Sequence, residues 1–243
     1  DKLELAIHYL RQYLEFHPED VDAQVRLAEL IVKRNPGQRG RTDLLFLYDK
    51  ILRLDPARDE IRREALATAL ALGKYADAVT HAEGLLKAVP TEAALWHRLA
   101  EAQTGLNQFR PARTSYETAV RLAPQELLGY QMLAQLVWRN IEDTPGAREV
   151  LDRMVKALPQ EPEAFLIRAR FETFTADEAG GVPAAPAPAA PPYQRAIADL
   201  QRVLELDPEH AQASLLLAEI MQRNKNIPAA HALLRDAVTL YPK

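Results

Sequence analysis

The chain has 243 residues, 48% of them hydrophobic, which is enough apolar material for one or two globular domains. Its 30 Lys and Arg against 34 Asp and Glu give a net charge of −4, which excludes the strongly basic surface of a general nucleic-acid binder. The absence of cysteine excludes disulfides, thiolate metal sites and cysteine nucleophiles, and leaves a cytoplasmic and a periplasmic location equally open.

Targeting signals are missing from the sequence as given. No apolar run approaches the ~20 residues needed to span a bilayer, so we expect no membrane segment, and the chain does not open with a signal peptide. The first residue is Asp1 rather than Met, and we therefore expect the sequence to be a piece of a longer protein. An anchor or signal outside this piece would decide the compartment.

Proline recurs at a nearly fixed interval along the chain. Pro56, Pro90 and Pro124 are 34 residues apart, as are Pro208 and Pro242. Proline lacks an amide hydrogen and disfavours helical geometry in the residue before it, so each of these prolines predicts the end of a helix. The interval therefore predicts an internal repeat of helical units.

Each interval contains two helical patterns joined by a short turn. Before Pro124, small and apolar residues recur at helical spacing, as at Ala112 and Tyr116. An earlier pattern, seen at Trp96 and Leu99, ends in a polar turn. The unit is therefore two helices and a turn, and the predicted fold class is all-α.

The segment 93–126 resembles a tetratricopeptide repeat. Its residues at the signature positions of that family are Trp96, Leu99, Ala100, Phe109, Ala112, Tyr116, Ala119 and Pro124. The resemblance implies a right-handed α-solenoid of stacked helix-turn-helix repeats, in which helix A of each repeat crosses helix B closely at small residues.

The same frame covers nearly the whole chain and predicts a single solenoid over 1–243. It gives a half repeat followed by six full repeats, with the boundaries 1–20, 21–58, 59–92, 93–126, 127–161, 162–210 and 211–243. Alanine stands at the small position of every helix B except the first full one, which has Leu44. Leu66 replaces an alanine of helix A, and Arg168 stands where leucine is usual, so we expect altered helix crossing in those two repeats.

Two insertions are predicted in the turns between helices A and B. A short one of about four residues falls around 35–43 in the first full repeat. The other is the Pro/Ala-rich stretch GGVPAAPAPAAPP, which lies between the expected helix A residue Ala169 and the expected helix B residue Ala196. We therefore place it at about 177–192 inside the fifth full repeat, as extended chain without a core of its own.

No residues converge on a catalytic, metal or cofactor site. The six histidines are dispersed, with no pair at the i, i+4 spacing of a helical metal site. The only serines, Ser115 and Ser214, lie on predicted helices and outside any nucleophile motif. We therefore expect a non-catalytic protein without a metal or cofactor.

The resemblance implies a concave surface, lined by helix A of each repeat, that binds a protein or peptide partner. Its first half is charged, as at Arg26, Glu29 and Arg63, whereas its second half is more apolar. The predicted groove residues of that second half are Leu128, Gln131, Met132, Gln135, Trp138, Ile167, Arg170 and Leu216. The alternative is that some of these side chains pack against neighbouring helices.

Two other functions stay open. The chain could be a regulatory or substrate-docking region of a larger enzyme, which the full-length protein would decide. It could also be a self-assembly module, because the last predicted helix, 227–241, has an apolar face and no polar capping helix after it. The residues of that face are Ala230, Leu233, Leu234 and Val238.

Two further kinds of binding are not expected. The basic segment with Lys33, Arg34, Arg39 and Arg41 is the best hint of nucleic-acid or phosphate binding, but four cations on a loop make a weak, salt-sensitive site. The Lys and Asn set with which some members of the family clamp a chaperone's terminal carboxylate is missing from the predicted concave surface. We therefore expect no nucleic-acid partner.

Overall fold

The structure is a computed structural model that describes residues 2–35, 37–178, 193–224, 226 and 228. Every regular element in this described part is an α-helix, which confirms the predicted all-α class. Most of the predicted Pro/Ala-rich insertion and of the predicted helix 227–241 lies outside the described residues, and both stay predictions. None of the described helices is long and apolar enough to span a membrane.

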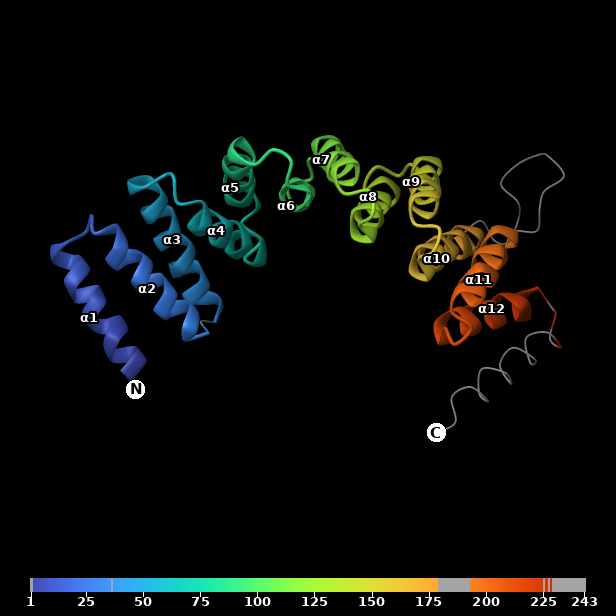
Figure 1. The fold of residues 1–243 in the computed structure, drawn as a ribbon, viewed down its shortest axis with the longest axis horizontal. Coiled ribbons are helices and arrows are strands. Elements are labelled where there is room, and N and C mark those ends of the chain that lie inside the picture. Colours follow the sequence, from blue (N-terminus) through green and yellow to red (C-terminus); the bar gives the residue numbers. More distant parts are fainter. Residues whose placement is uncertain (1, 36, 179–192, 225, 227, 229–243) are drawn as a thin grey trace. The chain divides into compact units, whose positions relative to one another are not determined.

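The helices follow one another as a series of pairs after a single first helix, α1 (Lys2–Phe16) (Figure 1). The pairs are α2 (Val21–Lys33) with α3 (Gln38–Leu54), α4 (Asp59–Ala71) with α5 (Tyr75–Ala88), α6 (Ala93–Gly105) with α7 (Phe109–Leu122), α8 (Leu127–Arg139) with α9 (Thr144–Ala157), and α10 (Pro162–Glu178) with α11 (Gln194–Leu206). Helix α12 (Ala211–Arg223) is the last one described.

The chain divides into two compact units, residues 1–123 and 124–243. The first unit contains α1 to α7, and the second contains the described helices α8 to α12. Within each unit every helix packs against the one before and the one after it, as expected for a quasi-one-dimensional repeat protein. The division falls at the end of α7, close to one of the predicted repeat boundaries, and the single solenoid over 1–243 stays a prediction.

Small residues let the two helices of a pair approach each other. Ala78, Ala112, Ala147 and Ala196 are all completely buried on the second helices of four pairs. Between these contacts, large side chains such as Leu133 fill the core, and burial of one such side chain stabilises the fold by about 2 kcal/mol. The pattern of small and large apolar residues thus accounts for the pairwise packing.

Proline and polar caps end and begin these helices. Helices α3, α5, α7 and α11 each end two residues before a proline. At the start of α2, the Asp20 carboxylate accepts a hydrogen bond of 2.9 Å from the amide of Ala23, and Asp143 caps α9 by accepting one of 2.8 Å from Gly146. The helix boundaries therefore follow from local chemistry.

Both predicted insertions are partly helical, which corrects their expected loop conformation. Helix α3 begins at Gln38, so Arg39 and Arg41 lie on its first turns, where the Thr42 hydroxyl donates to the Gln38 carbonyl at 3.2 Å. Helix α10 has 17 residues, whereas α8 and α12 have 13, so it extends into the predicted insertion. On its last turns, Ala176 packs against the apolar core that includes Tyr193.

Gly105 makes room for a side chain of the preceding helix, and we expect Gly105→Ala to destabilise the first unit. A Cβ at Gly105 would lie 2.5 Å from atoms of the Tyr75 ring, including Cγ, which rotation of the ring about the Cβ–Cγ bond does not move. The clash should outweigh the better helix propensity of alanine and cost about 1 kcal/mol net. Urea unfolding followed by circular dichroism measures the change.

Gly84→Ala is the matched control on α5. Its added Cβ would meet only the flexible Arg62 side chain, at 2.9 Å and beyond. That side chain can move, so this variant should gain about 0.5–1 kcal/mol from helix propensity. Equal effects of the two substitutions would contradict the proposed role of the Tyr75 contact.

Candidate functional site

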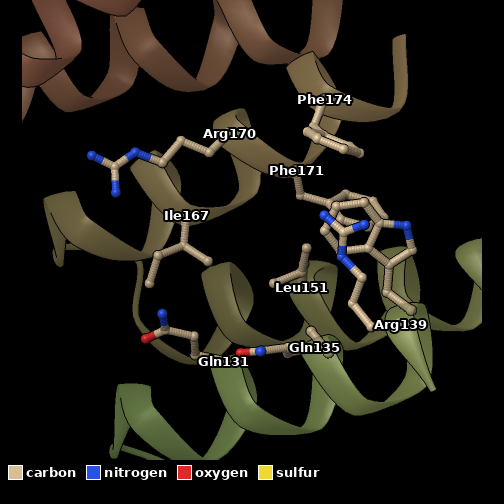
Figure 2. A pocket seen from close by; sticks show the side chains of 10 residues that line it. Gln131, Gln135, Arg139, Leu151, Ile167, Arg170, Phe171 and Phe174 are labelled. Carbon is tan, nitrogen blue, oxygen red and sulfur yellow. The ribbon is translucent and has the colours of Figure 1, made fainter. Parts of the chain in front are cut away.

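A groove of about 380 Å³ lies in the second unit between α8 and α10. Its walls come from one face of each helix, because the lining residues of each follow the spacing i, i+3, i+4, i+7. Figure 2 shows these two walls, with Leu151 of α9 between them. The lining residues of this α8–α10 groove are Gln131, Ala134, Gln135, Trp138, Arg139, Leu151, Ile167, Arg170, Phe171 and Phe174.

An aromatic cluster closes one end of the α8–α10 groove. The Trp138 ring meets the rings of Phe171 and Phe174 edge to face, with centroid distances of 5.2 and 5.0 Å. The Arg139 guanidinium stacks 3.7 Å from the Trp138 centroid and 4.7 Å from that of Phe174. Such contacts hold the side chains in place, so this wall is formed before any ligand arrives.

The groove carries two positive charges without a salt bridge. Neither Arg139 nor Arg170 forms one with any residue in the described part of the chain, and Arg170 donates instead to the side-chain oxygen of Gln212 at 2.7 Å. Both arginine residues are exposed. The groove is therefore electropositive around an apolar centre.

A cluster of charged residues on α9, α10 and α11 lies next to the groove and is internally neutral. Its members are Arg148, Asp152, Arg168, Glu172, Arg195 and Asp199. Arg168 binds the Asp199 carboxylate with two hydrogen bonds of 2.9 and 2.6 Å and reaches Asp152 at 2.8 Å. The unusual Arg168 of the sequence is thus the centre of a salt-bridge network between three helices.

The other half of this cluster fixes Glu172, the residue after Phe171. Arg148 binds the buried Glu172 carboxylate with two hydrogen bonds of 2.9 and 3.0 Å, and Arg195 approaches it to 3.1 Å. The hydrogen bonds from Arg148 to Glu172 raise the pKa of the guanidinium above its usual value. Glu172 is therefore fully engaged and does not neutralise the groove arginines.

The structure brings five of the eight predicted groove residues together. Gln131, Gln135, Trp138, Ile167 and Arg170 line the α8–α10 groove, whereas the other three predicted residues are not among its described lining residues. Their assignment to partner binding stays a prediction.

The three remaining residues lie elsewhere for simple geometric reasons. Met132 follows Gln131 directly and so points about 100° away around α8. Leu128 is 54% exposed on the first turn of the same helix. Leu216 packs against the apolar core of α10, α11 and α12, which is the alternative that the sequence left open.

Sequence reasoning missed the aromatic residues Phe171 and Phe174 and the stacked Arg139. The helical spacing of the sequence could have indicated the two phenylalanines, because they lie on the same helical face as Ile167 and Arg170. Phe174 is the thirteenth residue of α10, as Arg139 is of α8, so it lay within the helix length that the repeat frame expects.

The first unit also has a groove between the first helices of two successive pairs, here α2 and α4, with a volume of about 530 Å³. Tyr48 of α3 lies between the two walls, and burial raises the pKa of its hydroxyl to about 12. The lining residues of this α2–α4 groove are Val25, Ala28, Glu29, Val32, Lys33, Tyr48, Glu60, Ile61, Arg63 and Glu64.

The α2–α4 groove differs in charge from the α8–α10 groove. Arg63 of the α2–α4 groove forms two hydrogen bonds of 2.7 and 2.6 Å with Glu92, so its positive charge is neutralised. Glu60, Glu64 and Lys33 form no salt bridge with a described residue, which leaves a surplus of negative charge. The two grooves are therefore of opposite charge.

No three His, Asp or Glu side chains of the described residues gather as metal ligands. The Ser115 hydroxyl is buried and donates to the side-chain oxygen of Gln103 at 2.8 Å. It links two helices and has no basic partner there.

Comparison with protein families supplies the identity of the fold. A tetratricopeptide repeat model matches residues 69–137 and 193–243. The chain belongs to the tetratricopeptide repeat family. This confirms the resemblance seen in segment 93–126, and it places the chain among repeat scaffolds whose general role is protein–protein interaction.

Two solved structures share the tetratricopeptide fold of this chain. One is the C-terminal part of a repeat-containing protein from Cytophaga hutchinsonii, with a TM-score of 0.63 and 16% identity over 88% of this chain and 78% of that one. The other is MamA, with a TM-score of 0.53 and 15% identity over 75% of this chain and 91% of that one. At these identities the likeness concerns the fold alone.

Two curated relatives match part of this tetratricopeptide repeat protein. ER membrane protein complex subunit 2 of Xenopus tropicalis is 28% identical over 134 residues, which are 53% of this chain and 43% of the relative. Subunit 2-B of Xenopus laevis matches with the same figures. The chain thus spans less than half the length of these relatives.

Proposed function

We propose that this tetratricopeptide repeat protein is a non-catalytic scaffold that holds a segment of a protein partner in the α8–α10 groove. The observation that carries this proposal is the convergence of one face of α8 and one face of α10 on a shared groove with a preformed aromatic end. Grooves with an apolar centre, aromatic anchors and a polar rim are typical binding sites for partner segments.

The size of the groove favours a side chain or two of a partner over a folded domain. About 380 Å³ is near the lower end of the range for ligand pockets, about 300–1,000 Å³. The partly exposed Trp138 and Phe174 rings offer apolar area to such a side chain. The Xenopus relatives are named as a subunit of a complex, which is consistent with a role in assembly.

The sequence left two alternative functions open, and each requires different evidence. A regulatory or docking region of a larger enzyme would use the same groove, and only the full-length protein separates that role from a free-standing scaffold. Self-association through 227–241 rests on residues outside the described part of the chain. The α8–α10 groove favours the scaffold, because it supplies a binding surface with no catalytic group.

Site-directed photo-crosslinking tests the proposal. A photoreactive amino acid at the exposed Gln135 should crosslink to a cellular partner, and the same group at the exposed Lys156, outside the groove, should not. A purified partner should then bind Trp138→Ala about tenfold more weakly than the parent, as expected for an anchor residue.

Gln135→Trp separates loss of binding from loss of stability. Trp138→Ala also removes ring contacts with Phe171 and Phe174, whereas Gln135→Trp fills the groove from an exposed position. It should block partner binding while the melting temperature stays near that of the parent, and Lys156→Trp should change neither. Normal partner affinity in Gln135→Trp would exclude this groove as the binding site.

A further inference from the structure

We infer that the partner segment bound by the α8–α10 groove is acidic: an apolar side chain enters the centre of the groove, and carboxylates on either side of it pair with Arg139 and Arg170. This inference rests on the proposed function, because it assigns the chemistry of the partner at that same site. Figure 2 shows the two arginine residues on opposite sides of Ile167 and Leu151.

Arg139 is held in position, and its guanidinium makes no hydrogen bond with a residue that the structure describes. Stacking on Trp138 at 3.7 Å and near Phe174 at 4.7 Å occupies the face of the guanidinium. The N–H groups of a guanidinium lie at its edge, and Arg139 makes no salt bridge with a described residue. A stacked, preorganised guanidinium is well suited to bind a carboxylate with two hydrogen bonds, because little side-chain entropy is lost.

Arg170 supplies the second cation from the opposite side. It donates one hydrogen bond of 2.7 Å to the amide oxygen of Gln212, which orients the side chain and leaves its charge uncompensated. Ile167 lies three residues before it on the same face of α10. A ligand that places an apolar group against Ile167 would therefore bring its next residues close to a cation.

Two carboxylates of α10 near the groove, those of Glu172 and Asp177, are already engaged. Glu172 is bound by Arg148 and Arg195, and Asp177 accepts hydrogen bonds from Tyr193 and Arg223. These acids therefore have partners of their own and do not compete for the groove arginines. Two arginine residues with no acidic partner among the described residues, next to these two engaged acids, indicate a site whose counter-charge comes with the ligand.

The α2–α4 groove gives an internal comparison. It also lies between the first helices of two successive pairs. However, Glu92 neutralises its Arg63, and Glu60 and Glu64 make this groove electronegative. An acidic segment would be repelled there. The charge of the α8–α10 groove is therefore a property of this one site and does not follow from the repeat fold.

A single-stranded nucleic acid is the other ligand that would use aromatic rings together with cations. A peptide is favoured because nucleic-acid binding draws on many phosphate contacts, whereas this groove has two cations in a chain of net charge −4. The apolar centre around Ile167 and Leu151 also suits an aliphatic or aromatic side chain. An oligonucleotide is therefore included in the test as the competing ligand.

Binding of short synthetic peptides to the intact chain tests the inference by fluorescence anisotropy. The probes are four peptides with two flanking residues on each side of a central one: phenylalanine flanked by glutamates, by glutamines or by lysines, and alanine flanked by glutamates. The glutamate-flanked phenylalanine peptide should bind about tenfold more tightly than its glutamine counterpart, and the advantage should shrink at high salt. The lysine-flanked and alanine-centred peptides should bind more weakly still.

Paired variants assign the preference to the groove. Arg139→Gln/Arg170→Gln should bind the glutamate-flanked and glutamine-flanked peptides equally. The control Lys156→Gln/Arg202→Gln removes two charges from the same unit outside the groove and should keep the tenfold ratio. Gln135→Trp should abolish binding of both peptides.

Several results would overturn the inference. They are equal affinity of the parent for the glutamate and glutamine peptides, a preference that survives in Arg139→Gln/Arg170→Gln, no detectable binding of any peptide, or tighter binding of a twelve-residue oligothymidine than of the acidic peptide. If one of these occurs while Gln135→Trp still blocks binding of the purified partner, the proposed function stands and only the acidic chemistry fails. If Gln135→Trp leaves binding of that partner intact, the proposed function itself fails.

Discussion

Arg168→Leu is expected to destabilise the second unit by about 3–5 kcal/mol, although leucine is the residue at the equivalent position of α8 and α12. The cost arises because Asp199, only 3% exposed, would lose both of its hydrogen bonds from Arg168 and remain buried without a hydrogen-bonded counter-charge. Asp152 would keep Arg195 at 2.7 Å and contribute less. Urea unfolding followed by circular dichroism measures the loss.

A second substitution should restore most of this stability. Val150 occupies the position of α9 that Asp199 occupies in α11, three residues after the small alanine, and it is 2% exposed. In Arg168→Leu/Asp199→Val the buried charge is absent, so the double variant should return to within about 1 kcal/mol of the parent or exceed it.

The control is Arg202→Leu, which removes an exposed salt bridge to Glu205 and should cost less than about 1 kcal/mol. A stable Arg168→Leu variant would show that the network contributes no more than an exposed pair. Failure of Asp199→Val to rescue it would mean that the cost comes from packing and not from the buried carboxylate.

His81→Val is expected to stabilise the first unit by about 2 kcal/mol at neutral pH. His81 is 5% exposed on α5, and neither of its ring nitrogens forms a hydrogen bond with a described residue, although Nε2 lies 3.3 Å from a carboxylate oxygen of Asp49. Valine already occupies the equivalent buried position of α9, at Val150. The substitution therefore replaces an unsatisfied polar ring by an apolar side chain that the repeat accommodates.

The gain from His81→Val should increase as the pH is lowered. Burial lowers the pKa of His81 below its usual value of 6.5 in the folded chain. The unfolded chain therefore takes up a proton first as the pH falls through about 6.5, and the parent loses stability until the lower, folded pKa is reached. The variant lacks this proton uptake, so its advantage should be larger at pH 5 than at pH 7.5.

Unfolding midpoints in urea at the two pH values measure this difference. His8→Val, at an exposed position of α1, is the control for removing a histidine from the same unit. An advantage of His81→Val that is the same at both pH values would contradict a neutral, buried imidazole in the parent.

The repeat architecture was predictable because its signals are local. Proline ends helices through its own backbone, and alanine residues such as Ala112 mark close helix crossings wherever they recur at a fixed interval. The same frame put Trp138 and Ile167 on the first helices of two successive repeats, where they line one groove. Local signals thus identified the helices and part of the candidate site.

The electrostatic features could not be predicted from the sequence, because they depend on how the helices pack. Arg168 stood out as a departure from the usual leucine, but its partner Asp199 lies 31 residues further along, on a different helix. Similarly, the stacking of Arg139 on Phe174 joins two helices of different pairs. The packing of the helices therefore determines which charged side chains form pairs.

The extended C-terminal end of α10 shows how one repeat can lengthen its first helix without changing its stacking. The last four residues of α10, 175–178, lie beyond the 13-residue length of α8 and α12, and the Asp177 carboxylate among them accepts hydrogen bonds from Tyr193 and Arg223. Completely buried residues such as Ala169 form the core shared with α11. Insertions between the helices of a repeat reach only one edge of a solenoid. A repeat can therefore gain length at that edge without a change in the core that stabilises the scaffold.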